Sequence, residues 1–250
     1  MGGGPVNGCG ASLRWTGEGA RPHTSIPTRD RLQPARIAAM PKPSAAARAR
    51  KIKLILFDVD GVLTDGKIWI FPAPSGGQQS GAQPSVVERP AQHGGQPGSG
   101  FQSTSLIEAK GFHAHDGTAI MLARLAGIKT GIITKRISET VGLRARDLKI
   151  DHVYQGIQDK ASVFAQILEI DGITAAEAAF VGDDVIDLPA MRKCGLAIAV
   201  KNARPEVKAE AHWATSHAGG DGAARDAIEY ILKAQGKWKQ AVEEYILERS

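Results

Sequence analysis

The chain has 250 residues, 42% of them hydrophobic and 23% charged, which is enough apolar sequence for one α/β domain with extensions. Its formal charge of +5 is concentrated in residues 1–50, where seven Arg and one Lys face two acidic side chains, so residues 51–250 are close to neutral. That distribution removes the charge argument for a nucleic-acid-binding protein, and no apolar run approaches the ~18 residues that a membrane span requires.

Residues 1–50 are rich in Gly, Arg, Pro and Ala and show no sustained hydrophobic period, so we predict a basic, disordered, low-complexity tail. They lack the apolar segment of a signal peptide. We interpret residues 1–39 as an extension upstream of a natural start at Met40; the alternative is an Arg-rich arm for anionic partners. Cys9 and Cys194 match no metal or redox spacing, which favours a cytoplasmic protein.

The stretch 52–65 reads Ile-Lys-Leu-Ile-Leu-Phe-Asp-Val-Asp-Gly-Val-Leu-Thr-Asp. Its short apolar run predicts a buried parallel strand, which places Asp58 and Asp60 at the carboxyl end, where open α/β sheets bind ligands. Two carboxylates this close repel each other unless a cation lies between them, so the pair indicates a hard divalent ion such as Mg²⁺. The plain alternative is a strand that ends in a polar turn.

Residues 67–71 and 105–110 have strand character and predict a β-hairpin. Between them, residues 72–103 are mostly Gly, Gln, Ser and Pro with hardly any charge, a composition that predicts a flexible insertion at the hairpin tip.

From residue 116 onwards, strand and helix patterns alternate regularly, which predicts a three-layer, doubly wound parallel sheet of Rossmann type. The predicted strands are 129–134, 152–154, 178–181 and 196–200, and the predicted helices are 116–126, 138–148, 159–170, 188–194 and 223–234. We expect Asp116 to cap the first of these helices. The expected domain spans residues 51–235, and residues 236–250 form a C-terminal helical tail.

Polar side chains follow the predicted strands or open the next helix. In chain order they are Asp58 with Asp60, Thr134, Lys160, and Asp183 with Asp184 and Asp187. A carboxylate can attack phosphorus, and a second acid two residues on can protonate the leaving oxygen and later activate water. A hydroxyl and an ammonium can hold phosphoryl oxygens while a metal neutralises developing charge. Each residue alone has an ordinary structural explanation, but the ordered set indicates phosphoryl transfer.

The same residues carry a resemblance to a known family. Asp58-Val-Asp-Gly-Val-Leu-Thr, Thr134, Lys160 and Gly182-Asp-Asp-Val-Ile-Asp resemble motifs one to four of the haloacid dehalogenase superfamily. Within it, stretches 112–117, 152–156, 182–189 and 219–226 are similar to the 3-deoxy-D-manno-octulosonate 8-phosphate (Kdo-8-phosphate) phosphatase subfamily. The resemblance covers roughly residues 52–232, interrupted by the insertion.

The resemblance implies residue roles. Asp58 is the implied nucleophile and Asp60 the acid/base, while Thr134 and Lys160 steady the phosphoryl group. Mg²⁺ is implied at the Asp58 side chain, the Asp60 main-chain carbonyl and Asp183, with Asp184 and Asp187 behind them. Implied substrate contacts are His113, Ala114, His115, Asp116, Gly117, Met121, Arg136, Arg144 and Lys160. For Arg144, ordinary surface charge is an equally open interpretation.

Three features depart from the subfamily pattern: Lys135 stands where Gly is frequent, Asp226 where Glu is usual, and the 72–103 insertion where a short hairpin is kept. Only 26 residues separate Thr134 from Lys160, too few for an inserted cap domain. A capless site must exclude water by other means, and the resembling subfamily does so as a homotetramer. We therefore expect a homotetramer with residues 219–226 as an intersubunit lid.

The sequence thus predicts a Mg²⁺-dependent phosphatase of a small sugar-acid phosphate, with Kdo-8-phosphate as the first candidate and a role in lipopolysaccharide biosynthesis. A nonulosonate 9-phosphate is the nearest alternative substrate. A non-catalytic binding subunit on the same fold is the alternative from a different class. Neither nucleic acid nor membrane is an expected partner.

Overall fold

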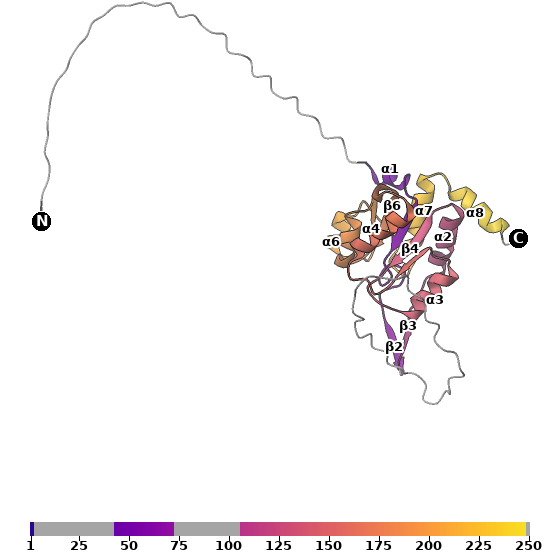
Figure 1. Cartoon of the computed structure of the whole chain (residues 1–250), viewed down its shortest axis with the longest axis horizontal. Helices are drawn as coiled ribbons and strands as arrows, with labels where there is room; N and C mark the ends of the chain where they lie inside the picture. The colour runs from indigo at the N-terminus through magenta and orange to yellow at the C-terminus, as the bar shows by residue number, and fades with distance from the viewer. Residues whose placement is uncertain (3–42, 73–105, 249–250) are drawn as a thin grey trace, which may run out of the picture. The chain divides into compact units, whose positions relative to one another are not determined.

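A computed structural model describes residues 1–2, 43–72 and 106–248. The predictions for residues 3–42, including Met40 as a start, and for the 73–105 part of the insertion lie outside the described residues. The folded unit lies within residues 42–250 (Figure 1). In the described part of the chain, no helix is both long and apolar enough to cross a membrane.

The core of the fold is a six-stranded parallel sheet, which confirms the predicted fold class. Its spatial order is β5-β4-β1-β6-β7-β8, and every neighbouring pair is parallel. The strands are β1 (Leu54–Phe57), β4 (Lys129–Ile133), β5 (His152–Tyr154), β6 (Ala178–Gly182), β7 (Leu196–Ala199) and β8 (Trp213–Ala214). All residues of β1, β6 and β7 are buried, as expected for strands covered on both faces.

Helices cover the sheet on both sides (Figure 1). On one face α2 (Ala114–Leu125) packs against α7 (Ala223–Ala234) and α8 (Trp238–Leu247), with α3 (Glu139–Asp147) beside α2. On the other face α4 (Lys160–Asp171) contacts α5 (Leu188–Met191), which contacts α6 (Pro205–Glu210). Two short 3₁₀ helices, η1 (Ala175–Glu177) and η2 (Val185–Asp187), flank β6.

A short helix, α1 (Ala45–Ala49), lies in the segment for which the sequence predicts a disordered tail. The Ser44 side chain accepts a hydrogen bond from the Ala47 amide and caps the helix, Ala49 is fully buried, and α1 contacts α7. The folded part of the chain therefore begins before residue 51, because this Ala-rich turn finds a surface on which to pack.

The assignment of Asp116 as a helix cap is wrong. Helix α2 begins at Ala114 after His113, which makes no capping side-chain bond, and Asp116 lies within the first turn. The Asp116 carboxylate instead accepts a hydrogen bond (2.8 Å) from the Arg225 amide in the first turn of α7. That helix follows Gly222 and has no side-chain cap of its own. A tertiary contact has replaced the local one.

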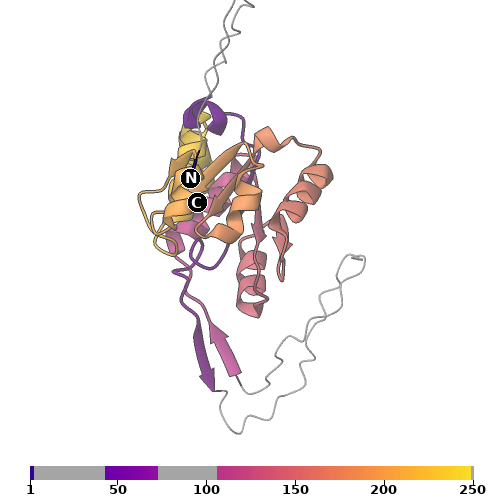
Figure 2. The same ribbon diagram turned by 90° about the vertical axis from the view of Figure 1, so that its left-hand side faces the viewer.

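The predicted hairpin is present as β2 (Trp69–Pro72) and β3 (Leu106–Ala109), paired antiparallel. Figures 1 and 2 both show it extending away from the carboxyl end of the sheet. Its apolar side chains are exposed: Trp69 at 54%, Ile70 at 59%, Phe71 at 48% and Ile107 at 47%. A hairpin with this much exposed apolar surface is unusual on an isolated chain and indicates a contact surface.

Candidate active site

The turn after β1 brings Asp58 and Asp60 to the carboxyl edge of the sheet. The Val59 carbonyl accepts hydrogen bonds from the amides of Val62, Leu63 and Thr64, which closes the chain into a tight turn. Gly61 has a φ of +91°, and a Cβ at this position would lie 2.2 Å from Asp183 Oδ2. Glycine is therefore required here both by backbone conformation and by the nearness of the neighbouring carboxylate.

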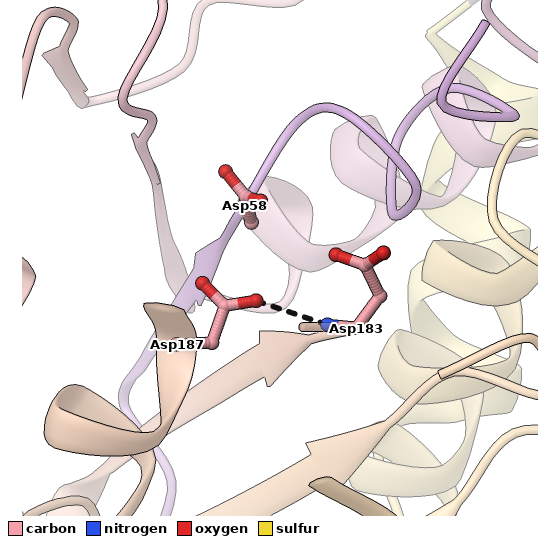
Figure 3. Close-up of side chains that lie close together, drawn as sticks. All are labelled: Asp58, Asp183 and Asp187. Carbon is pink, nitrogen blue, oxygen red and sulfur yellow. Dashed lines mark hydrogen bonds between the residues drawn. The ribbon is translucent and has the colours of Figure 1, made fainter. Parts of the chain in front are cut away.

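Three carboxylates converge at this edge. Oxygen atoms of Asp58, Asp183 and Asp187 all lie within 4.8 Å of one another, and Figure 3 shows these side chains gathered beyond the ends of β1 and β6. One oxygen of Asp187 accepts hydrogen bonds from the amides of Asp183 (3.0 Å) and Asp184 (3.3 Å). Asp183 Oδ1, by contrast, is buried without a hydrogen-bond partner. The Asp184 side chain caps η2 through the Val185 amide.

Lys160 is the cation of this cluster. Helix α4 starts at Lys160 because Asp159 caps it through the Ala161 and Ser162 amides. The ammonium lies 2.8 Å from Asp58 and 2.6 Å from Asp187, and the side chain is only 2% exposed. Burial alone would lower the pKa of Lys160, but the negative charges of Asp187 and Asp58 outweigh it and raise that pKa. Lys160 is therefore a permanent positive charge within the site.

When no cation lies between them, the clustered carboxylates repel one another, and this repulsion helps to raise their pKa values. Burial and then the charge of Asp187 raise the pKa of Asp58 to about 6, although Lys160 opposes the shift. Burial, followed by the charges of Asp187, Asp58 and Asp184, raises the pKa of Asp183 to about 7. Clustered carboxylates with an unpartnered buried oxygen are the donor set that a hard divalent cation prefers. The residues present therefore fit a Mg²⁺ ion, held chiefly by Asp58 and Asp183, since Asp187 is already bonded to Lys160 and two amides.

Thr134 directly follows β4, the neighbour of β1, and is 2% exposed. Its amide donates to the Tyr154 carbonyl and its carbonyl accepts from Ile157, so its main chain is fixed on both sides. Parallel pairing of β4 with β1 places Thr134 at the same sheet edge as the carboxylates.

Asp60 lies in a cluster of charged side chains that the sequence analysis predicted only in part. The Arg136 Nε atom is 3.8 Å from Asp60, and an Arg136 amine is 3.2 Å from Glu108. The ammonium of Lys110, whose side chain is fully buried, also pairs with Asp60 and lies 3.7 Å from Glu108. Lys110 and Glu108 were missed because a single Lys at the end of a predicted strand carries no motif.

The implied substrate contacts do not form one group. Among the described residues, His113, Asp116, Gly117 and Arg144 line one narrow cavity between α2 and α3, whereas His115 lines a separate groove against α7. Ala114 and Met121 line neither of these two hollows. The narrow cavity holds about 10 Å³, room for about one water molecule and not for a sugar.

Gly117 and Arg144 are fitted to each other within that cavity. A Cβ on Gly117 would lie 2.4 Å from an Arg144 amine, so a larger residue here would have to displace the end of the Arg144 side chain. Arg144 Nε and Asp116 Oδ2 are both buried without a hydrogen-bond partner, and burial raises the pKa of Asp116. Polar atoms of this kind are normally satisfied by a buried water.

Comparison with known proteins places the chain in a family. The haloacid dehalogenase-like hydrolase family matches residues 132–226. The chain is 36% identical over 195 residues to the 3-deoxy-D-manno-octulosonate 8-phosphate phosphatase KdsC of Escherichia coli strain K12, covering 78% of this chain and 87% of that protein. The Yersinia pestis KdsC is 33% identical, with 78% and 87% coverage.

Solved structures agree. The Moraxella catarrhalis phosphatase of the same name, crystallised with magnesium, phosphate and Kdo, superposes with a TM-score of 0.65 at 31% identity, covering 80% of this chain and 97% of that one. The Yersinia pestis phosphatase gives 0.63 at 32% identity, with 78% and 88% coverage. This chain belongs to the haloacid dehalogenase superfamily and, within it, to the family of the Kdo-8-phosphate phosphatases.

Proposed function

We propose that the protein hydrolyses Kdo-8-phosphate to Kdo and phosphate, which would supply Kdo for lipopolysaccharide. The observation that carries the proposal is the group of buried Asp58, Lys160 and Asp187 with half-buried Asp183 at the carboxyl edge of the sheet. It occurs in a chain that covers most of the length of the KdsC phosphatases.

In the proposed mechanism an Asp58 oxygen attacks phosphorus, so that an aspartyl phosphate forms while the bond from phosphorus to the sugar oxygen breaks. Asp60 gives its proton to that leaving oxygen. In the second step Asp60 takes a proton from water, the water oxygen attacks phosphorus, and the bond to Asp58 breaks. Lys160 keeps Asp58 ionised and oriented through its 2.8 Å contact, and the Thr134 hydroxyl steadies a phosphoryl oxygen.

Asp58, Asp183 and the Asp60 main-chain carbonyl are the proposed holders of Mg²⁺, with Asp184 and Asp187 behind them. When bound, the ion neutralises charge on the phosphoryl oxygens. Without that neutralisation, the substrate phosphate would face the clustered acids around Asp183, whose raised pKa already reports their mutual repulsion.

The test is Mg²⁺-dependent phosphate release from a panel of Kdo-8-phosphate, a nonulosonate 9-phosphate, arabinose 5-phosphate and an aryl phosphate. We expect strong preference for Kdo-8-phosphate and loss of all activity in Asp58→Asn with the fold retained. Preference for the nonulosonate ester would transfer the assignment to that substrate. Full turnover by Asp58→Asn would refute the nucleophile, and a wild-type protein inactive on every ester would leave a non-catalytic subunit.

We further propose a homotetramer in the cytoplasm. The exposed apolar face of the β2–β3 hairpin, with Trp69, Ile70 and Phe71, supports an intersubunit contact. Light scattering should give a tetramer, and Trp69→Asp should shift it towards smaller species because a charge would then have to be buried. A wild-type monomer at micromolar concentration would refute the assembly.

Residues 219–226 were expected to act as an intersubunit lid. In the structure this segment contacts the catalytic turn of its own chain, since the Gly220 amide donates to the Val62 carbonyl at 3.1 Å. The role of residues 219–226 as an intersubunit lid stays a prediction.

A further inference from the structure

We propose that Asn202 is a positioning residue for the nucleophile-bearing turn, a role that neither the motifs nor the chemistry above assigns to it. Asn202 lies after β7, 141 residues from Gly61 in the chain, and its side chain holds the Gly61 peptide in place. The inference rests on the proposed function only in that Asp58, three residues before Gly61, is taken as the nucleophile.

Both ends of the Asn202 side-chain amide are hydrogen-bonded. Its Nδ2 donates to the Gly61 carbonyl at 3.1 Å, and its Oδ1 accepts from the Gly219 amide at 2.7 Å. The Gly61 carbonyl requires a donor and the Gly219 amide requires an acceptor. Together they fix the orientation of the Asn202 amide, with Nδ2 towards Gly61 and Oδ1 towards Gly219. A carboxylate offers no donor and an ammonium no acceptor, so an amide suits this bridge where either charged group would not.

Two backbone segments lie in close contact around this bridge. A Cβ on Gly219 would lie 1.8 Å from the Gly61 carbonyl oxygen, and one on Gly220 would lie 2.3 Å from the Asp65 amide nitrogen. The Gly220 amide also donates to the Val62 carbonyl. The Gly219–Gly220 peptide thus packs directly against the turn that follows Asp58, and Asn202 is hydrogen-bonded to both segments.

Gly61 also lies against the Asp183 carboxylate. Figure 3 shows the chain that leaves Asp58 passing beside Asp183, and a Cβ on Gly61 would come within 2.2 Å of that carboxylate. The Gly61 peptide is therefore confined between Asp183 and Gly219. A shift of this peptide would change the separation of Asp58 and Asp183, the two side chains that the chemistry needs in register.

The turn that carries Asn202 is itself held by hydrogen bonds. In its turn the Arg204 amide donates to the Asp183 carbonyl at 2.8 Å, and the Lys201 amide donates to Thr215 Oγ1 at 3.0 Å. Ala203 is buried. The turn is thus bonded to the main chain of Asp183. Asn202 therefore fixes the position of the turn after β1 relative to the carboxyl end of β6. Rigid support of this kind is what keeps reacting groups within a fraction of an ångström.

The exposed position of Asn202 makes the inference testable, because truncating its side chain opens no cavity in the core. Three variants are compared: Asn202→Ala, Asn202→Asp and, as a matched control, Lys201→Ala. Lys201 lies in the same exposed turn, and its main-chain amide, not its side chain, donates to Thr215 and His217. Steady-state kinetics on Kdo-8-phosphate and on an aryl phosphate is combined with circular dichroism and thermal unfolding.

We expect Asn202→Ala to lower kcat by about tenfold to a hundredfold, with KM within about twofold, because misplacement by about 1 Å costs on that order. Asn202→Asp should lose at least as much although it has the same shape. Its carboxylate can still accept from Gly219, but it cannot donate to Gly61 and places an oxygen against that carbonyl. Lys201→Ala should match the wild type.

The inference is overturned if Asn202→Ala keeps kcat within twofold of Lys201→Ala, or if its kcat falls only in proportion to the folded fraction. A rise in KM at unchanged kcat would also overturn it, since that result indicates a substrate contact. Gly219→Ala provides an independent check: a folded variant with wild-type kcat would show that the close backbone packing is unimportant. A wild-type protein without phosphatase activity would overturn the proposed function together with this inference, whereas an active wild type matched by Asn202→Ala overturns this inference alone.

Discussion

We predict that the charge of Asp183 destabilises the metal-free protein and is required for its activity. Its pKa is raised from 3.8 to about 7, first by burial and then by the charges of Asp187, Asp58 and Asp184. At pH 7.5 and without a cation, folding has to keep this carboxylate ionised among other acids. The change Asp183→Asn removes that charge while keeping the shape of the side chain. We therefore expect it to stabilise the metal-free protein and to abolish activity.

The magnitude follows from the pKa. Moving it from 3.8 to about 7, at about 1.4 kcal/mol for each pKa unit, gives an upper bound of about 4 kcal/mol. Asp183 is only partly buried, so screening by solvent reduces this to about 2 kcal/mol. For a folded domain of about 200 residues, that free energy of unfolding corresponds to a rise in Tm of about 4–8 °C.

The pH dependence has a definite sign. Because the pKa of Asp183 is higher in the folded state, the folded protein binds more protons than the unfolded chain between about pH 4 and pH 7. The stability of the metal-free wild type should therefore fall as the pH rises through this window. Asp58, whose pKa is raised to about 6, adds an effect of the same sign over a narrower range.

The assay is thermal unfolding in EDTA from pH 5 to pH 8, repeated with excess Mg²⁺. Asp183→Asn should exceed the wild type at pH 7.5 by a margin that shrinks steadily as the pH falls to 5, and it should gain less from Mg²⁺. The matched control is Asp184→Asn, an exposed neighbour whose Oδ1 still caps the Val185 amide, and it should change Tm little. An Asp183→Asn protein less stable than the wild type in EDTA at pH 7.5 would refute the reasoning.

Two further substitutions test the cations of the site. Lys160→Met leaves Asp58 and Asp187 without their buried ammonium. It should therefore lower the free energy of unfolding by about 3 kcal/mol or more and abolish phosphate release. Wild-type stability in denaturant unfolding would contradict this. Lys110→Met removes the ammonium that pairs with Asp60, so kcat should fall by about tenfold while the circular dichroism spectrum stays unchanged. An unchanged kcat would show that Lys110 does not position Asp60.

The strands and the acids at their ends could be predicted because both signals are local. In β1 a buried apolar run stops at Asp58, and in β6 another stops just before Asp183. Parallel strands all expose their carboxyl ends at one edge, so residues at those ends gather there whatever the details of packing. The fold class and the composition of the carboxylate cluster were therefore accessible from the sequence.

The positions of the implied substrate-contact residues were less accessible, since they depend on where helix faces point after packing. Asp116 was expected to cap its own helix, yet its carboxylate lies against the first turn of α7, 109 residues further along the chain. His115 and His113, two residues apart, line different hollows. The direction of each side chain is set by how α2 is rotated against α7 and α3. No periodic pattern in a single sequence encodes that rotation.

The sequence by itself determined the alternation of strand and helix, the order of Asp58, Thr134, Lys160 and Asp183, and the chemistry that those groups can perform. Only the tertiary structure decided which side chains hold them in place. Lys110 reaches Asp60 across 50 residues and Asn202 reaches Gly61 across 141. Neither contact leaves a local mark, because a hydrogen bond between distant segments depends on the packing of the whole sheet and not on the spacing of neighbouring residues.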